Sequence, residues 1–192
     1  MRNRFVGLCA IVFAGLLLAG CVPSFVNPLS DVRTAKIDTR LIGTWISPST
    51  KEKGYLHILP GENGMSDGIA VSFNNKNGGD WTRYSMFSTR IGKHWFLNIK
   101  DQDKSGKDPV GKNVPYFIVR YRIVENNRLD LWLMSQDSAE TAIANGLKGE
   151  IKKSKFGKSV RITASSAELM QYVKRVDPTK LFEESLGTLQ RQ

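Results

Sequence analysis

From residue 40 onward, apolar and polar positions alternate in short runs that are rich in branched and aromatic residues. Clusters of Gly, Pro, Asn and Ser separate these runs, and no helical period lies between them. This pattern predicts a mainly β fold, an antiparallel meander that closes into a barrel of about eight strands. The seven clearest strand runs are residues 41–47, 55–59, 69–74, 81–90, 94–100, 116–124 and 129–135.

One hairpin, formed by residues 116–124 and 129–135, can be placed in register from the sequence. A two-residue turn at Asn126 and Asn127 would mix apolar and charged positions on one face. A three-residue loop over residues 125–127 instead keeps one face apolar, with Asn127 expected in the left-handed conformation. This register predicts the apolar pairs Ile123 with Leu129, Tyr121 with Leu131 and Val119 with Leu133, and the outer pairs Arg122 with Asp130 and Arg120 with Trp132.

After residue 135 the apolar period lengthens to three or four residues, which predicts two or three short helices. The first is expected to begin at Asp137 or Ser138 and to end at residues 145–146. A strand over residues 160–163 follows, and Ser165 with Glu168 then forms the capping-box pattern of a second helix. A third helix is expected to begin at residues 177–178 and to include Leu181, Phe182 and Leu186.

The N-terminus has the layout of a secretory signal. Arg2 and Arg4 precede an apolar run over residues 5–18, and small residues follow. The sequence Leu18-Ala19-Gly20-Cys21 resembles the lipobox of bacterial lipoproteins, which implies a lipid on Cys21 and membrane attachment through that lipid. The alternative is an uncleaved membrane anchor over residues 5–22. In the lipoprotein family, Val22 after the cysteine implies the outer membrane, facing the periplasm.

This layout predicts a signal peptide over residues 1–20, a lipid-attached tether over residues 21–39 and a single domain over residues 40–192. The tether is expected from the Pro, Ser and Asn content of residues 22–39. The other cysteine, Cys9, lies in the leader, so no disulfide is expected in the domain. Of the 28 basic and 18 acidic side chains, Arg2 and Arg4 lie in the leader, which leaves 26 and 18 and a net charge of +8.

This positive charge bears on partners rather than on the fold. Nucleic acid is excluded as a partner of an exported domain, whereas anionic lipid or another anionic envelope component fits. Basic residues are densest where only Glu150 opposes them, and this run is either a solvated face or a surface that orients the domain at a membrane. The members of this basic patch are Lys148, Lys152, Lys153, Lys155, Lys158 and Arg161.

The start of the first strand, Gly43-Thr44-Trp45, resembles the G-x-W start of lipocalins and their calycin relatives. The resemblance implies that Trp45 packs across a closed barrel end, beside Arg120 or Arg122, and that the open end holds a small apolar ligand. Trp45 as an ordinary core aromatic is the alternative. The loop over residues 101–115 would bring Lys104, Lys107 and Lys112 to the mouth, where they could meet an anionic group of the ligand. It starts like a calcium loop, but Lys112 occupies the position of the essential glutamate.

The sequence contains few residues that could form a catalytic or metal site. The two histidines, His57 and His94, are isolated within strand runs, and no thiol accompanies them in the domain. The sequence therefore predicts no enzyme, no metal site and no cofactor. Two hypotheses remain. The first is a module that binds a small apolar or amphipathic ligand, and the second is an envelope structural or protein-interaction module with a filled barrel.

Overall fold

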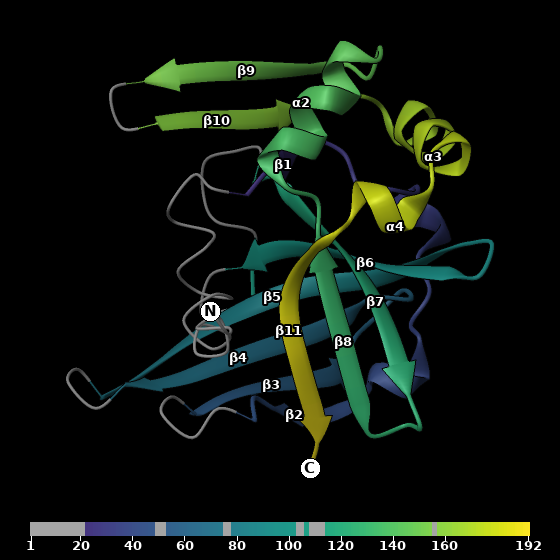
Figure 1. The fold of residues 1–192 in the computed structure, drawn as a ribbon. Coiled ribbons are helices and arrows are strands. Elements are labelled where there is room, and N and C mark those ends of the chain that lie inside the picture. The colour runs from purple at the N-terminus through teal and green to yellow at the C-terminus, as the bar shows by residue number, and fades with distance from the viewer. Residues whose placement is uncertain (1–21, 49–52, 75–77, 103–105, 108–113, 155–156) are drawn as a thin grey trace, which may run out of the picture.

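The computed structural model of the chain describes residues 22–48, 53–74, 78–102, 106–107, 114–154 and 157–192 (Figure 1). Its centre is a closed antiparallel barrel of eight strands, in which each strand pairs with the next and the last pairs with both β8 and β2. The mainly β prediction is confirmed. The barrel strands are β2 (Gly43–Ile46), β3 (Lys53–Pro60), β4 (Ser66–Asn74), β5 (Gly78–Ile91), β6 (His94–Gln102), β7 (Tyr116–Val124), β8 (Arg128–Leu133) and β11 (Glu184–Arg191).

The predicted register of the β7–β8 hairpin is confirmed. Ile123 pairs with Leu129, and the outer Arg122 lies 2.8 Å from the Asp130 carboxylate. The three-residue loop over residues 125–127 is confirmed, but the expected left-handed residue is wrong, because Glu125 (φ 50°) and Asn126 (φ 59°) take this conformation in place of Asn127. The Asn127 N–H donates to the Val124 carbonyl, which closes a β-turn with positive φ at both central residues.

The closing strand β11 corrects the expectation for the end of the chain. The predicted last helix is reduced to α4 (Pro178–Leu181), and Leu186 lies in the strand. This strand fills the gap between β8 and β2, so its backbone groups join two ladders and Leu186 packs into the barrel interior. Ladder bonds and burial outweigh the local helical pattern here.

A second layer covers the outer face of β6 and β7 (Figure 1). It contains the ribbon of β9 (Gly149–Ser154) and β10 (Gly157–Ile162), and the helices α2 (Gln136–Ala144), α3 (Ser166–Arg175) and α4. The capping box of α3 is confirmed, whereas α2 is capped by Ser135 instead of Asp137 or Ser138. The Ser135 hydroxyl accepts the Ser138 N–H at 3.1 Å, which places the helix start two residues earlier. The lysine-rich strand β9 was not expected from the sequence.

Residues 22–39, expected as a tether, include segments that pack against this layer and against the barrel. The short strand β1 (Ser24–Phe25) pairs with β10 and with the first residue of β7. Phe25 and Leu29 are buried in the second core, and the Leu29 N–H donates to the Asn98 side chain at 2.7 Å. Two 3-10 turns, η1 (Val32–Thr34) and η2 (Thr39–Leu41), lead to β2. Two well-spaced apolar residues thus fix a segment whose composition is typical of a linker. In the described part of the chain, no helix has the length and hydropathy to cross a bilayer.

Candidate ligand-binding end of the barrel

One end of the barrel is closed around Trp45. Its side chain has no exposed surface, and its indole N–H donates to the Leu41 carbonyl at 2.8 Å. Leu41 ends η2, so this 3-10 turn lies over the tryptophan. The structure therefore places Trp45 at a closed end, where the lipocalin resemblance implies it.

The arginine beside Trp45 is Arg191 from the last strand, rather than the expected Arg120 or Arg122. Its guanidinium carbon lies 4.3 Å from the centroid of the Trp45 ring. It also donates hydrogen bonds to the carbonyls of Ile42 (2.8 Å), Asn126 (2.7 Å) and Arg40. Arg120 and Arg122 point outward because they alternate with the interior residues of β7, and they lie over Trp132.

A buried polar group adds to this closed end. The Tyr121 hydroxyl donates to the Asp38 carboxylate at 2.8 Å, and Arg40 forms an ion pair with Asp38 at 2.7 Å. Burial alone would raise the pKa of Asp38, but hydrogen bonds from Arg40 and Tyr121 outweigh it and hold the pKa below its usual value. Burial raises the pKa of Tyr121. These contacts fix residues 38–42 over this end of the barrel.

The middle of the barrel is filled by side chains. Tyr84, Met86 and Ile58 are almost completely buried in the interior core. Gly68 lies directly against this filling, because a Cβ atom there would come within 2.4 Å of the Met86 side chain. A deep cavity of the kind implied by the resemblance is therefore absent at this level of the described interior.

Interior side chains are accessible to solvent at the opposite end of the barrel, where β2 connects to β3, β4 to β5 and β6 to β7. Three small interior residues there, Ala70, Ser72 and Thr82, are partly exposed. They share the inner face with Leu56, since β3, β4 and β5 pair Leu56 with Ala70 and Ala70 with Thr82. The same end carries buried interior apolar side chains, namely Phe117, Leu133 and Leu186.

Asp101 places a carboxyl group among these interior residues. It follows Leu97 and Ile99 along the inner face of β6 and pairs across the sheet with Tyr84. Its Oδ1 atom is buried and has no hydrogen-bond partner, and burial raises the pKa of the carboxyl group. An unmatched buried acceptor is costly in a folded protein. The open end thus combines apolar walls, hydroxyl groups and one acceptor able to bind a ligand N–H or O–H group.

Of the three predicted loop lysines, only Lys107 is among the residues that the structure describes. Lys104 and Lys112 lie outside the described residues. Lys107 is exposed, and its neighbour Gly106 lies against the guanidinium of Arg83 on the outer face of β5. The acid that the structure brings inside, Asp101, was considered from the sequence only as part of an apparent calcium loop.

The basic patch lies near more acidic side chains than its sequence indicates. Lys148 pairs with Glu168 at 2.6 Å, and Lys158 pairs with Glu140 at 2.6 Å and with Asp137 at 3.0 Å. Lys148 lowers the pKa of Glu168 to about 2. The expectation that only Glu150 opposes this run is therefore wrong, because the fold brings in carboxylates from α2 and α3.

The remaining basic residues of the patch lie on the ribbon. Lys152 is 3.9 Å from Glu150 and mostly exposed, and Lys153 is exposed on the same strand, β9. Arg161 is half-buried on β10 and pairs in register with Glu150. Lys155 is outside the described residues. The positive charge is thus concentrated on β9, which ends the sheet.

Neither histidine joins a reactive group among the described residues. His57 lies 2.9 Å from the Thr44 hydroxyl, and its ring stacks on Tyr55. His94 lines a shallow surface pocket with Val173 and Pro178, and burial, Arg120 and Lys93 lower its pKa. The described His, Cys, Asp and Glu residues form no group of three that could hold a metal ion.

No match to this chain was found among protein-family models, curated proteins or solved structures.

Proposed function

We propose that this chain is a lipoprotein of the bacterial envelope, anchored through Cys21 to the outer membrane on its periplasmic side, whose barrel binds a small amphipathic ligand without catalysis. The observation that carries the binding part is the buried Oδ1 atom of Asp101, which has no hydrogen-bond partner. It lies on the inner face of the barrel at the end where Ala70, Ser72 and Thr82 are partly exposed. The anchor is supported by the lipobox-like residues 18–21.

The filled middle of the barrel limits the ligand. Because Tyr84 and Met86 block the deeper interior, a bound molecule can bury only the part that reaches the level of Ala70 and Thr82. Phe117, Leu133 and Leu186 suit an apolar portion, and Asp101 suits a hydroxyl or amino group. This site fits one end of an amphipathic molecule, the rest of which remains outside the barrel.

The binding test uses the full chain purified from membranes in mild detergent. Native mass spectrometry and solvent extraction should recover a small amphipathic molecule with the wild-type protein. Leu133→Trp, which fills the open end, should abolish recovery, whereas the exposed outer substitution Leu59→Trp should leave it unchanged. Equal recovery with both variants, or no ligand with the wild type, would exclude the site.

The anchor is tested separately by feeding cells a clickable fatty acid. Wild-type protein and Cys9→Ser should carry the label, and Cys21→Ser should lose it. Label on Cys21→Ser, or unlabelled wild-type protein, would contradict lipid attachment. Fractionation of the labelled protein between inner and outer membranes tests the location.

A second candidate function, docking on an anionic envelope component, is favoured by strand β9. This strand is at the end of the sheet and exposes Lys152 and Lys153. Charge reversal at these two lysines should then remove a co-purifying partner while ligand recovery is unchanged. If the partner stays bound, the ribbon is a solvated face.

A further inference from the structure

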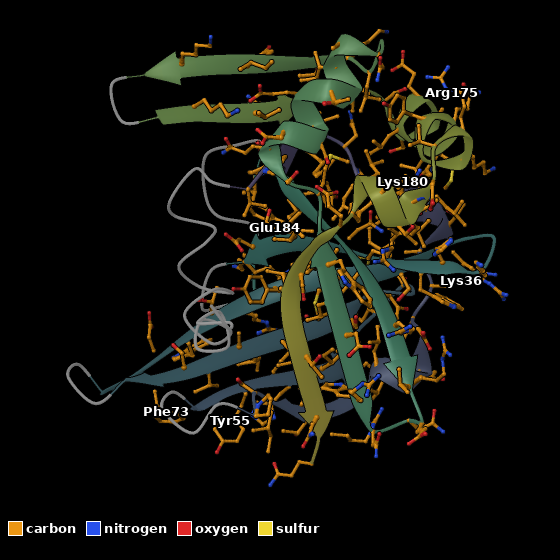
Figure 2. The ribbon with its side chains drawn as sticks, in the orientation of Figure 1. Lys36, Tyr55, Phe73, Arg175, Lys180 and Glu184 are labelled. Carbon is orange, nitrogen blue, oxygen red and sulfur yellow. The ribbon has the colours of Figure 1, made fainter. Side chains whose placement is uncertain are left out.

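Aromatic side chains are exposed on the outer surface of the barrel beside its open end. Phe73 at the end of β4 is 50% exposed, and Trp81 on β5 is 37% exposed. Tyr55 on β3 packs edge-on against Phe73, with ring centroids 6.1 Å apart (Figure 2). Isolated exposed apolar residues need no explanation, but a cluster of large aromatic rings marks an interaction surface.

The β9–β10 ribbon extends in the same direction as the β4–β5 hairpin (Figure 1). It exposes Ile151 (40%) next to Lys152 and Lys153. One side of the molecule therefore presents aromatic rings on one projection and lysines with an apolar side chain on the other. Tyrosine, tryptophan and lysine in this combination are typical of proteins at a membrane interface.

The described chain also begins at this side. Val22 packs against the interior core cluster, and Phe25 pairs with Tyr116 at the start of β7, which is the open end of that strand. Residues 1–21, with their apolar run and Cys21, are joined to the barrel at this point. A lipid on Cys21 would hold the open end, rather than the Trp45 end, next to the bilayer.

We infer that the open end of the barrel faces an anionic lipid bilayer, with Phe73 and Trp81 in the headgroup region and Lys152 and Lys153 at the lipid phosphates. This orientation rests on the proposed anchor at Cys21. It gives the ligand-binding end direct access to the membrane, so the amphipathic ligand exchanges with the bilayer rather than with the aqueous phase. The Trp45 end and the β5–β6 turn point away from the membrane.

The orientation is tested on the acylated full chain reconstituted in vesicles of phosphatidylethanolamine and phosphatidylglycerol. Single cysteines at Phe73→Cys and Ile151→Cys carry an environment-sensitive fluorophore, because acylation blocks Cys21. Matched controls are Asn126→Cys and Lys93→Cys, which are exposed in turns at the opposite end. Nitroxide-labelled headgroups should quench the probes at 73 and 151 at least threefold more than the two controls. Equal quenching at all four sites, or stronger quenching at 126, would overturn the orientation.

Charge reversal tests whether the lysines of β9 attract anionic lipid or only lie near the membrane. Each lysine near anionic lipid contributes about fivefold to membrane association. Lys152→Glu with Lys153→Glu should therefore reduce quenching at 151 in phosphatidylglycerol vesicles, and Lys93→Glu should not. Quenching that is unchanged by the reversal, or equal in pure phosphatidylcholine vesicles, would exclude anionic lipid as the partner. Probes at 73 and 151 that stay unquenched in vesicles but are protected in native membranes would show that a protein covers this side.

A wrong orientation can be distinguished from the absence of the lipid anchor. Mass spectrometry of the N-terminal peptide reports acylation in the same sample. Acylated protein with unquenched probes contradicts the orientation alone. If the protein is not acylated, the labelled chain is purified with Cys9 and Cys21 replaced by Ser and mixed with vesicles. Selective quenching at 73 and 151 would then support the surface without the anchor.

Discussion

The guanidinium of Arg191 lies 4.3 Å from the centroid of the Trp45 ring, so the second-last residue of the chain closes over the first barrel strand. The same guanidinium donates to carbonyls before β2 and in the β7–β8 turn. One side chain therefore joins three parts of the closed end that are far apart in sequence. Arg191 links β11 to β2 and to the β7–β8 turn at this end of the barrel.

Replacing this arginine should open the closed end. Arg191→Ala removes hydrogen bonds from a charged donor and a cation-π contact, and we expect a loss of about 2 to 4 kcal/mol in the free energy of unfolding. Urea unfolding of the detergent-solubilised chain measures this loss. Arg33→Ala, whose side chain is 88% exposed, is the control and should leave the unfolding midpoint unchanged. Equal effects would show that the contacts of Arg191 contribute no more than a surface ion pair.

The carboxyl group of Asp101 should lower the stability of the fold at neutral pH and contribute to ligand binding. Because burial raises the pKa of this carboxyl group, the folded state holds a proton that the unfolded state loses first. Its contribution to stability therefore falls as pH rises from the unfolded pKa through the folded pKa. Asp101→Asn should unfold at higher urea concentration at neutral pH, remove this pH dependence and reduce ligand recovery. A variant that is less stable than wild type at neutral pH would show that the charged carboxyl group is well paired in the fold.

The buried pair Tyr121 and Asp38 should have the opposite pH dependence. The pKa of Asp38 is lowered in the fold, so its stabilisation is complete above the unfolded value and is lost as pH falls through the folded value. Tyr121→Phe removes the hydrogen bond to a buried carboxylate and should cost about 1 to 3 kcal/mol at pH 7. Unfolding midpoints from pH 7 to pH 2.5 should show a smaller acid-induced loss in the variant than in wild type. Parallel pH curves would contradict the coupling.

Alternation explains why most of the barrel could be predicted. From Val119 to Ile123 in β7 and from Arg128 to Leu131 in β8, apolar and charged residues alternate, and only one register keeps the apolar face intact. The same period from Leu97 through Ile99 places Asp101 on the inner face, so the sequence contained a signal for the interior acid. The neighbouring residues resemble a calcium loop, and this resemblance placed Asp101 in the expected loop over residues 101–115.

The parts that could not be predicted depend on contacts between distant segments. Strand β11 has only Leu186 and Leu189 as large apolar residues, and Gly187 lies at the irregular pairing of Ser185 and Gly187 with β8. This segment forms a strand because it pairs with both β8 and β2, whose edges would otherwise be unpaired. No alternation of apolar and polar residues predicts the position of Arg191. Its contact with Trp45 forms only because the barrel closes.

Asn98 explains why the expected linker is packed, and it gives the sharpest test of that finding. Its buried side chain accepts the Leu29 N–H at 2.7 Å and donates to the Thr89 hydroxyl at 2.9 Å and to the Phe87 carbonyl at 3.2 Å. Asn98→Leu leaves the Leu29 N–H buried without an acceptor, which should cost about 1 to 3 kcal/mol. Hydrogen exchange should then accelerate in residues 24–30 more than in the β7–β8 hairpin. Uniform acceleration would mean that the variant weakens the whole barrel, and unchanged exchange in residues 24–30 would show that other contacts hold this segment.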